Sequence, residues 1–272
     1  MILDPDKIFA SRTGIKIKIL ILLAHITLVM WMLSSQFNFL FFIISAPILW
    51  FLIAKMGMEV GFHRYFCHKS FQTGPIREKL LLILGMISST GSSLTWVAAH
   101  RVHHRYADRP GDPQNSNTNS WWKNWLTIWT NDWSASATIV KDLMRDPWHR
   151  FCHRNYFKIL LIYVGILSSI SLYFSSWIPI IVLWSIPVVM NFNMAGFLNS
   201  FFHHKNFGYT NYQTNDDSRN HAILNLFMAG GGLHNNHHAN PDSYTFNTMN
   251  RWWEPDFTGW FIKNFLMTNG KN

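Results

Sequence analysis

The stretch His100-Arg101-Val102-His103-His104 organises the chain. Its three histidines stand at positions i, i+3 and i+4, which puts all three imidazoles on one face of a helix. Each neutral imidazole has a nitrogen lone pair that can bind a metal. The same spacing of histidines recurs at His234-Asn235-Asn236-His237-His238. The pair His63 and His68 precedes both stretches in sequence. We interpret these eight histidines as metal ligands and not as packed core residues.

The composition indicates a membrane protein. Of the 272 residues, 49% are hydrophobic and 14% are charged, whereas soluble domains average about 25% charged residues. The net charge of +9 favours contact with anionic lipid headgroups or with an acidic carrier. A nucleic-acid partner is not predicted, because the basic residues lie beside apolar stretches and form no separate basic domain. Two cysteines give no disulfide framework.

Four apolar stretches are each long enough to span a bilayer, which takes about 20 helical residues. They cover approximately residues 15–33, 37–58, 157–174 and 177–202. Very short turns at 34–36 and 175–176 join them in pairs. The sequence therefore predicts an all-α membrane protein with four transmembrane helices in two hairpins. A cytosolic helical cap from 59–156 and 203–272 would carry a histidine-rich dimetal site, within a single domain over 1–272.

The placement of basic residues predicts the orientation of these spans. Lys and Arg number 4 before or at the start of the first span, 14 between the second and third spans when Lys55 and Lys158 at their edges are counted, and 5 after the fourth, and neither short turn has one. The positive-inside rule then places both termini and every histidine cluster on the cytoplasmic side. We expect a multi-pass integral membrane protein in contact with lipid.

The number of histidines exceeds the need of one metal ion. A tetrahedral zinc site takes four ligands, so two metal ions are the natural number. The clusters lack cysteine pairs and Asp-rich loops, which argues against structural zinc and against calcium. All-imidazole nitrogen suits iron, copper or zinc. His203 stands four residues after Asn199 at the end of the fourth span, and spacing alone leaves open whether it is a further ligand.

Few carboxylates lie near the histidine clusters in sequence, namely those of Glu59, Asp108 and Asp112. Metal-binding histidines usually donate their second ring N–H to a carboxylate. We expect Glu59 and Asp112 to support the site in this way, although a loop cap and a surface charge would explain them equally well. His149, His153 and His221 have no patterned partner, and we interpret them as surface or supporting residues.

These motifs resemble those of the membrane-bound fatty acyl desaturases, closest to the Δ9 (stearoyl-CoA desaturase-like) branch. The matching stretches are Gly61-Phe-His-Arg-Tyr-Phe-Cys-His68, Trp96 to His104 with Asp112-Pro113, Asn199-Ser-Phe-Phe-His203, Ser218-Arg-Asn220, the last histidine box and Trp252-Trp-Glu-Pro-Asp256. The chain departs from the family pattern at Gly231, where the family often has Glu, and at His221, where it often has Asn.

The resemblance implies two iron ions, which zinc could replace in purified protein. The implied ligands are His63, His68, His100, His103, His104, His203, His234, His237 and His238. It further implies that Asn199 holds a metal-bound water and that Asn220 supports the site. The implied partners are an acyl substrate, linked to CoA, acyl carrier protein or lipid, and an electron donor such as ferredoxin or a cytochrome b5-like protein.

The leading hypothesis is an O2-dependent di-iron acyl desaturase that makes a cis double bond, of Δ9 type, in a saturated chain. Two irons can supply the electrons that activate O2, and no catalytic side chain is needed beyond the metal ligands. A hydroxylase or an acetylenase on the same metals is the alternative. A non-enzymatic metal-binding membrane protein is a remote one, because it predicts polar residues along the spans, which hold only His25 and scattered Ser, Thr and Asn.

Overall fold

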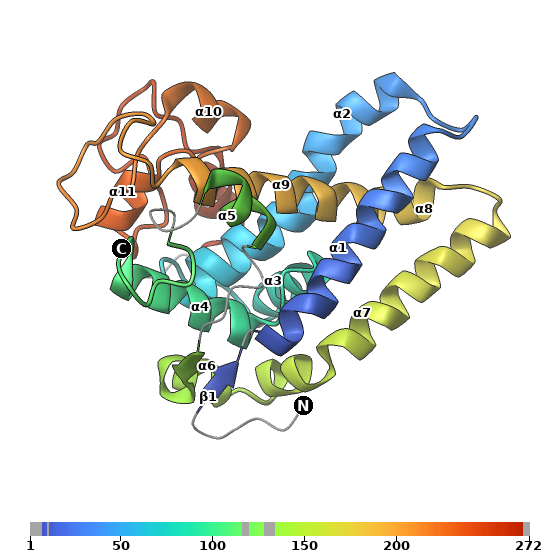
Figure 1. Ribbon diagram of the computed structural model, residues 1–272, viewed down its shortest axis with the longest axis horizontal. Helices are drawn as coiled ribbons and strands as arrows, with labels where there is room; N and C mark the ends of the chain where they lie inside the picture. Colours follow the sequence, from blue (N-terminus) through green and yellow to red (C-terminus); the bar gives the residue numbers. More distant parts are fainter. Residues whose placement is uncertain (1–6, 10, 116–119, 128–133, 269–272) are drawn as a thin grey trace.

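Four long apolar helices form the body of the computed structural model, and short helices and loops gather at one end of them (Figure 1). The structure describes residues 7–9, 11–115, 120–127 and 134–268. The long helices are α1 (Ser11–Met32), α2 (Phe39–Leu49) continued by the π-helix η1 (Trp50–Cys67), α7 (Pro147–Tyr173), and α8 (Ile178–Ile180) continued by η3 (Ile181–Ser185) and α9 (Ile186–Phe201).

These helices provide four segments that are long and apolar enough to cross a membrane: Gly14–Met32, Phe39–Cys67, Pro147–Tyr173 and Ile178–Phe201. The first and last agree closely with the predicted spans. The second continues past the predicted end at 58, so residues 59–67, which we assigned to the cap, lie on the same helix. The third begins at Pro147, where the side chain of Asp146 caps the helix, and not at 157. Hydropathy alone misses both extensions because their residues are more polar.

The membrane helices bury one face and expose the other. On α1, Ala24 and Trp31 are fully buried, whereas Ile15, Ile19 and Leu22 are more than half exposed. An apolar face without protein cover suits contact with lipid chains.

The two short turns between long helices lie at the same end of the molecule, on the right in Figure 1. The side-chain amide of Gln36 donates to the carbonyl of Ser175 at 2.8 Å and accepts from the backbone N–H of Trp177 at 3.0 Å.

The remaining elements are short. They are α3 (Pro75–Ile87), α4 (Ser93–Tyr106), α5 (Trp121–Thr127), η2 (Ala137–Val140), α6 (Lys141–Met144), α10 (Ala222–Phe227), α11 (His234–Ala239), α12 (Phe257–Phe261) and η4 (Ile262–Leu266). One antiparallel pair, β1 (Lys7–Phe9) with β2 (Ser134–Ser136), qualifies the all-α prediction, with Ile8 opposite Ala135. All other regular elements in the described residues are helices, as predicted.

Glycine lets η1 and α3 approach each other closely. A Cβ atom at Gly57 would overlap the backbone of Leu84, and one at Gly85 would overlap the ring of Phe62. Close backbone approach of this kind is a use for which only glycine is suited. The contact fixes the half of η1 that carries the first histidine pair.

Candidate metal centre

Nine histidines from four separate parts of the chain gather in two neighbouring groups. The first group contains His63, His68, His100, His104 and His237, and the second contains His103, His203, His234 and His238. Within each group the ligand nitrogens all lie within 4.8 Å of one another. The groups adjoin, since the rings of His104 and His238 stack with their centroids 4.5 Å apart. His203, which spacing left open, lies in the second group.

The π-helix η1 brings the first pair of histidines together. His63 and His68 are five residues apart, and the backbone N–H of His68 donates to the carbonyl of His63. A helix closed by i to i+5 hydrogen bonds places such residues almost above one another. Their ring centroids are 4.9 Å apart.

Helix α4 presents the second set from one face, as its spacing predicts. His100, His103 and His104 all reach the two groups. Arg101 points to the other side, where its guanidinium donates to the carbonyls of Phe66 and Cys67 and to Asp142. This arginine ties α4 to the end of η1, so the histidines of both helices keep one geometry.

A network of amides holds α11, which carries the third set. The side-chain oxygen of Asn220 accepts from the backbone N–H groups of Asn235 and Asn236. The Asn220 amide also donates to the side-chain oxygen of Asn236 at 2.8 Å. These three residues are completely buried. Asn220 therefore fixes the short helix that bears His234, His237 and His238.

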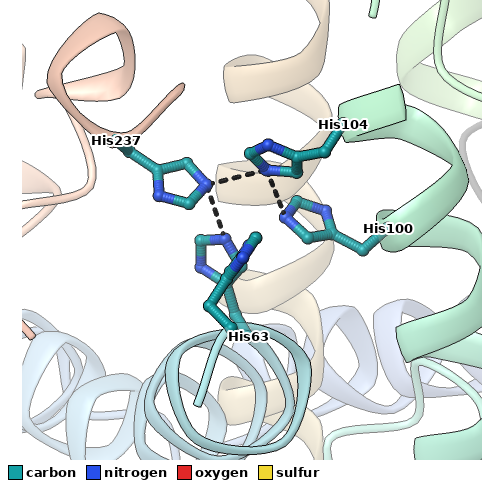
Figure 2. A group of neighbouring side chains, drawn as sticks. His63, His100, His104 and His237 are labelled. Carbon is teal, nitrogen blue, oxygen red and sulfur yellow. Dashed lines mark hydrogen bonds between the residues drawn. The ribbon is translucent and has the colours of Figure 1, made fainter. Parts of the chain in front are cut away.

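The nitrogens of the first group point at a common centre, as Figure 2 shows for four of its rings. The Nε2 atom of His237 lies 2.9 Å from Nε2 of His63 and 2.9 Å from Nε2 of His104. The His104 atom is also 3.0 Å from Nε2 of His100. A neutral ring nitrogen has either one proton or one lone pair, so it can make only one hydrogen bond. Protons alone cannot satisfy all three contacts, whereas a cation at the centre can.

The second group also has more close contacts between ring nitrogens than hydrogen bonds can satisfy. Nε2 of His234 lies 2.9 Å from Nε2 of His203 and 3.1 Å from Nε2 of His238. Buried ring nitrogens without a hydrogen-bond partner occur in both groups, at Nε2 of His68 and at Nε2 of His103. Unpaired buried polar atoms are costly. The donor set therefore fits metal ions with imidazole ligands.

Three carboxylates orient the rings of the second group. Nδ1 of His103 donates to Asp112 at 2.9 Å, and Nδ1 of His238 donates to Asp216 at 3.0 Å. Nδ1 of His203 donates to Asp108 at 2.8 Å. A carboxylate on Nδ1 leaves the Nε2 lone pair free for a metal and makes it more basic.

Burial keeps most of these imidazoles neutral. It lowers the pKa of His68 to about 3 and, despite the bond to Asp216, the pKa of His238 to about 4. Burial likewise lowers the pKa of His100 and of His237 well below the ordinary value. Neutral rings are the form that binds metals.

A cavity of about 70 Å³ adjoins both groups. Histidines of the first group, His63 and His100, and of the second, His103 and His234, line it. Its other walls are mostly apolar and include Met58, Trp96, Ala195, Leu198 and Phe246, and half-buried Asn199 also lines it.

Glu59 lines the same cavity but has other partners than expected. Its carboxylate pairs with Lys55 and, at 2.9 Å, with the guanidinium of Arg64. No hydrogen bond from a histidine to Glu59 occurs in the described part of the chain.

Sequence reasoning named Asp108 without giving it a role and missed Asp216. The two acidic residues just before Ser218-Arg219-Asn220 are the signal from which Asp216 could have been found.

Comparison with known proteins gives consistent matches. The fatty acid desaturase family matches residues 37–265. The sn-1 stearoyl-lipid 9-desaturase of Synechocystis is 32% identical over 232 residues, which cover 83% of this chain and 69% of that protein. Delta-9 acyl-lipid desaturase 1 of Arabidopsis thaliana is 28% identical, over 86% of this chain and 75% of its own length. The hex-5-enoyl-[acyl-carrier protein] acetylenase of Moorena producens is 31% identical, over 75% and 68%.

Proposed function

Because the chain belongs to the fatty acid desaturase family and is an acyl desaturase, we propose that it inserts a cis double bond at the Δ9 position of a saturated acyl chain. The observation that carries this proposal is the convergence of nine imidazoles on two centres beside one apolar cavity. The names of the plant and cyanobacterial relatives support the Δ9 position.

Two iron ions would occupy the two histidine groups, with zinc as a substitute in purified protein. The ligands would be the five histidines of the first group and the four of the second. Bound iron would supply the electrons for O2 reduction, chemistry that side chains do not provide. Asn199, at the cavity wall, would hold a water beside the metals.

The remaining side chains would position the rings and the substrate. Asp108, Asp112 and Asp216 would keep three imidazoles in the tautomer that directs Nε2 inward. Met58, Leu198 and Phe246 would hold the acyl chain against the metals and exclude water from the reacting carbons.

A bilayer would enclose the four long helices as two hairpins, in a single domain over the whole chain. The contact of Gln36 with Ser175 and Trp177 supports this arrangement, because it places both short turns at one end. The excess of Lys and Arg away from these turns supports a cytoplasmic location for both termini and for the capped histidine site.

The acyl group would be attached to a lipid, as the names of the Synechocystis and Arabidopsis thaliana relatives indicate. Ferredoxin or a cytochrome b5-like protein would deliver the electrons. An acetylenase is the second candidate, because the Moorena producens relative carries that name and acts on an acyl-carrier-protein substrate.

Product analysis tests the proposal. The iron-loaded protein, with O2 and an electron donor, is given stearoyl groups on lipid, on CoA and on acyl carrier protein. We expect a loss of about two mass units from the lipid-linked chain, against a gain of about 16 for a hydroxylase, and fragmentation locates the double bond. A product with a triple bond would favour the acetylenase, and no new product from any carrier would overturn the proposal.

A further inference from the structure

A second cleft lies between the beginnings of the membrane helices α1 and α7 and the beginning of α4. Its volume is about 410 Å³, which lies within the roughly 300–1,000 Å³ that ligand pockets commonly measure. The lining includes Lys16, Ser92, His153, Arg154 and Lys158 and shares no residue with the cavity beside the histidine groups.

The cleft is strongly basic. Lys16, Arg154 and Lys158 are exposed, and none of the described residues that line the cleft is an aspartate or a glutamate. Arg154 and Lys158 are four residues apart on α7, so they project from the same face. No salt bridge within the described residues neutralises any of the three cations, so the described lining of the cleft has a charge of three without an acidic partner.

The floor of the cleft also has a free polar atom. His153 is 5% exposed, and its Nδ1 lies 2.6 Å from the hydroxyl of Ser92. Its Nε2 atom is buried and has no partner in the described part of the chain. A buried ring nitrogen without a partner, on a residue that lines a basic cleft, can donate an N–H to an anionic oxygen.

The surface beside the cleft is apolar. Ile15 and Ile19 on α1 are 65% and 52% exposed, and Leu161 and Ile162 on α7 are 64% and 63% exposed. A basic cleft at the start of two membrane helices, with a bare apolar surface along those helices, matches an anionic headgroup with its two acyl chains. A soluble phosphate compound would use the cleft but not the apolar surface.

We propose that this cleft binds the phosphate group of an anionic phospholipid through Lys16, Arg154 and Lys158. A phosphate diester whose negative charge no headgroup cation balances is the chemistry that the cleft recognises, and the apolar surface beside it favours the lipid over a soluble phosphate. The site stands apart from the histidine groups, so it does not depend on the proposed Δ9 reaction.

Retention of lipid by the purified full-length protein tests this site. Native mass spectrometry would follow protein extracted from membranes of phosphatidylcholine alone and from membranes that also contain phosphatidylglycerol. We expect one tightly held phosphatidylglycerol in the wild type, and in Arg154→Gln/Lys158→Gln a loss of affinity on the order of 20- to 30-fold, since each basic residue near an anionic surface contributes about fivefold. The matched control Lys141→Gln/Lys263→Gln removes two exposed charges outside the cleft and should keep the lipid.

The other outcomes discriminate between ligands. Equal retention of phosphatidylcholine, or equal loss in the control variant, would overturn the site. Stabilisation by inorganic phosphate that depends on Arg154 and Lys158, without retention of phosphatidylglycerol, would identify a soluble phosphate and overturn the lipid assignment. Arg154→Lys/Lys158→Arg keeps the charge and should restore lipid binding, which separates loss of the site from loss of the fold.

Discussion

At the scale of single residues, carboxylates orient imidazoles of the candidate metal centre. Asp112 and Asp216 each accept from Nδ1 of one histidine, and the Nε2 atoms of those rings are thereby turned to the centre. The number of residues between each aspartate and its histidine differs greatly between the two pairs. Asp112 follows its partner His103 by nine residues, whereas Asp216 precedes His238 by twenty-two.

Asp216→Asn should weaken the second metal position. An amide removes the negative charge that makes the His238 ring basic, and loss of such partners typically costs about 10- to 100-fold in metal affinity or activity. Metal content after dialysis and product formation measure the effect. Asp242→Asn, at an exposed carboxylate, is the control. Unchanged metal content and turnover in Asp216→Asn would show that this carboxylate does not support the site.

Sequence reasoning worked for residues whose partners are local. The i, i+3, i+4 spacing of His100, His103 and His104 predicted one shared face, and the structure has it. Asp216 was missed because a loop brings it to His238, and closure of a loop of that length cannot be derived from spacing.

At the scale of elements, the π-helical winding of η1 could not be predicted from the sequence. In an α-helix with about 3.6 residues per turn, positions five apart point roughly 140° away from each other. His63 and His68 would then not meet, yet their rings are 4.9 Å apart because η1 is a π-helix. The apolar run predicted a helix only to residue 58, and it predicted neither the continuation of that helix through His63 nor its winding.

Gly57→Ala should disturb this element. The added Cβ would overlap the backbone of Leu84, and backbone cannot yield as a flexible side chain does. Overpacking of this kind typically costs about 1–3 kcal/mol, so we expect a lower melting temperature and less bound metal, because His63 follows on the same helix. Gly165→Ala on α7 is the matched control, since a Cβ there meets nothing within 4 Å. Equal melting temperatures in the two variants would contradict the close contact.

Asp142 joins α4 to its neighbours and gives this junction a pH dependence. Burial raises the pKa of Asp142, but hydrogen bonds from Arg101 and Lys69 outweigh it and hold the pKa well below the ordinary value. A carboxylate with a lowered pKa in the folded state adds stability above about pH 4, and this stability is lost as the pH falls further. Asp142→Asn should therefore be less stable than wild type at pH 7, with a difference that shrinks below about pH 4. Thermal unfolding across this range checks it, and a pH-independent difference would refute the argument.

At the scale of the whole molecule, a buried set of charges closes the C-terminal segment over the metal centre. Arg64, on η1, donates to Asp256 at 2.8 Å and to Glu59 at 2.9 Å, and it is 1% exposed. Its guanidinium also lies 3.6 Å from the ring centre of Phe246, whose ring contacts His237. The long helices were predictable from hydropathy, but this closure was not, because it joins residues that are 192 positions apart.

Asp256→Leu should destabilise the protein strongly, because it leaves the Arg64 charge buried without its main partner. Removal of one partner of a buried ion pair typically costs about 3–5 kcal/mol, whereas replacement of both by apolar residues is often nearly neutral. The double variant Arg64→Met/Asp256→Leu should therefore melt closer to wild type than Asp256→Leu does. Lys205→Met, which breaks an exposed pair with Asp217, should change the melting temperature little. If the two substitutions at Arg64 and Asp256 simply add, the pair is not the unit that holds the C-terminal segment on η1.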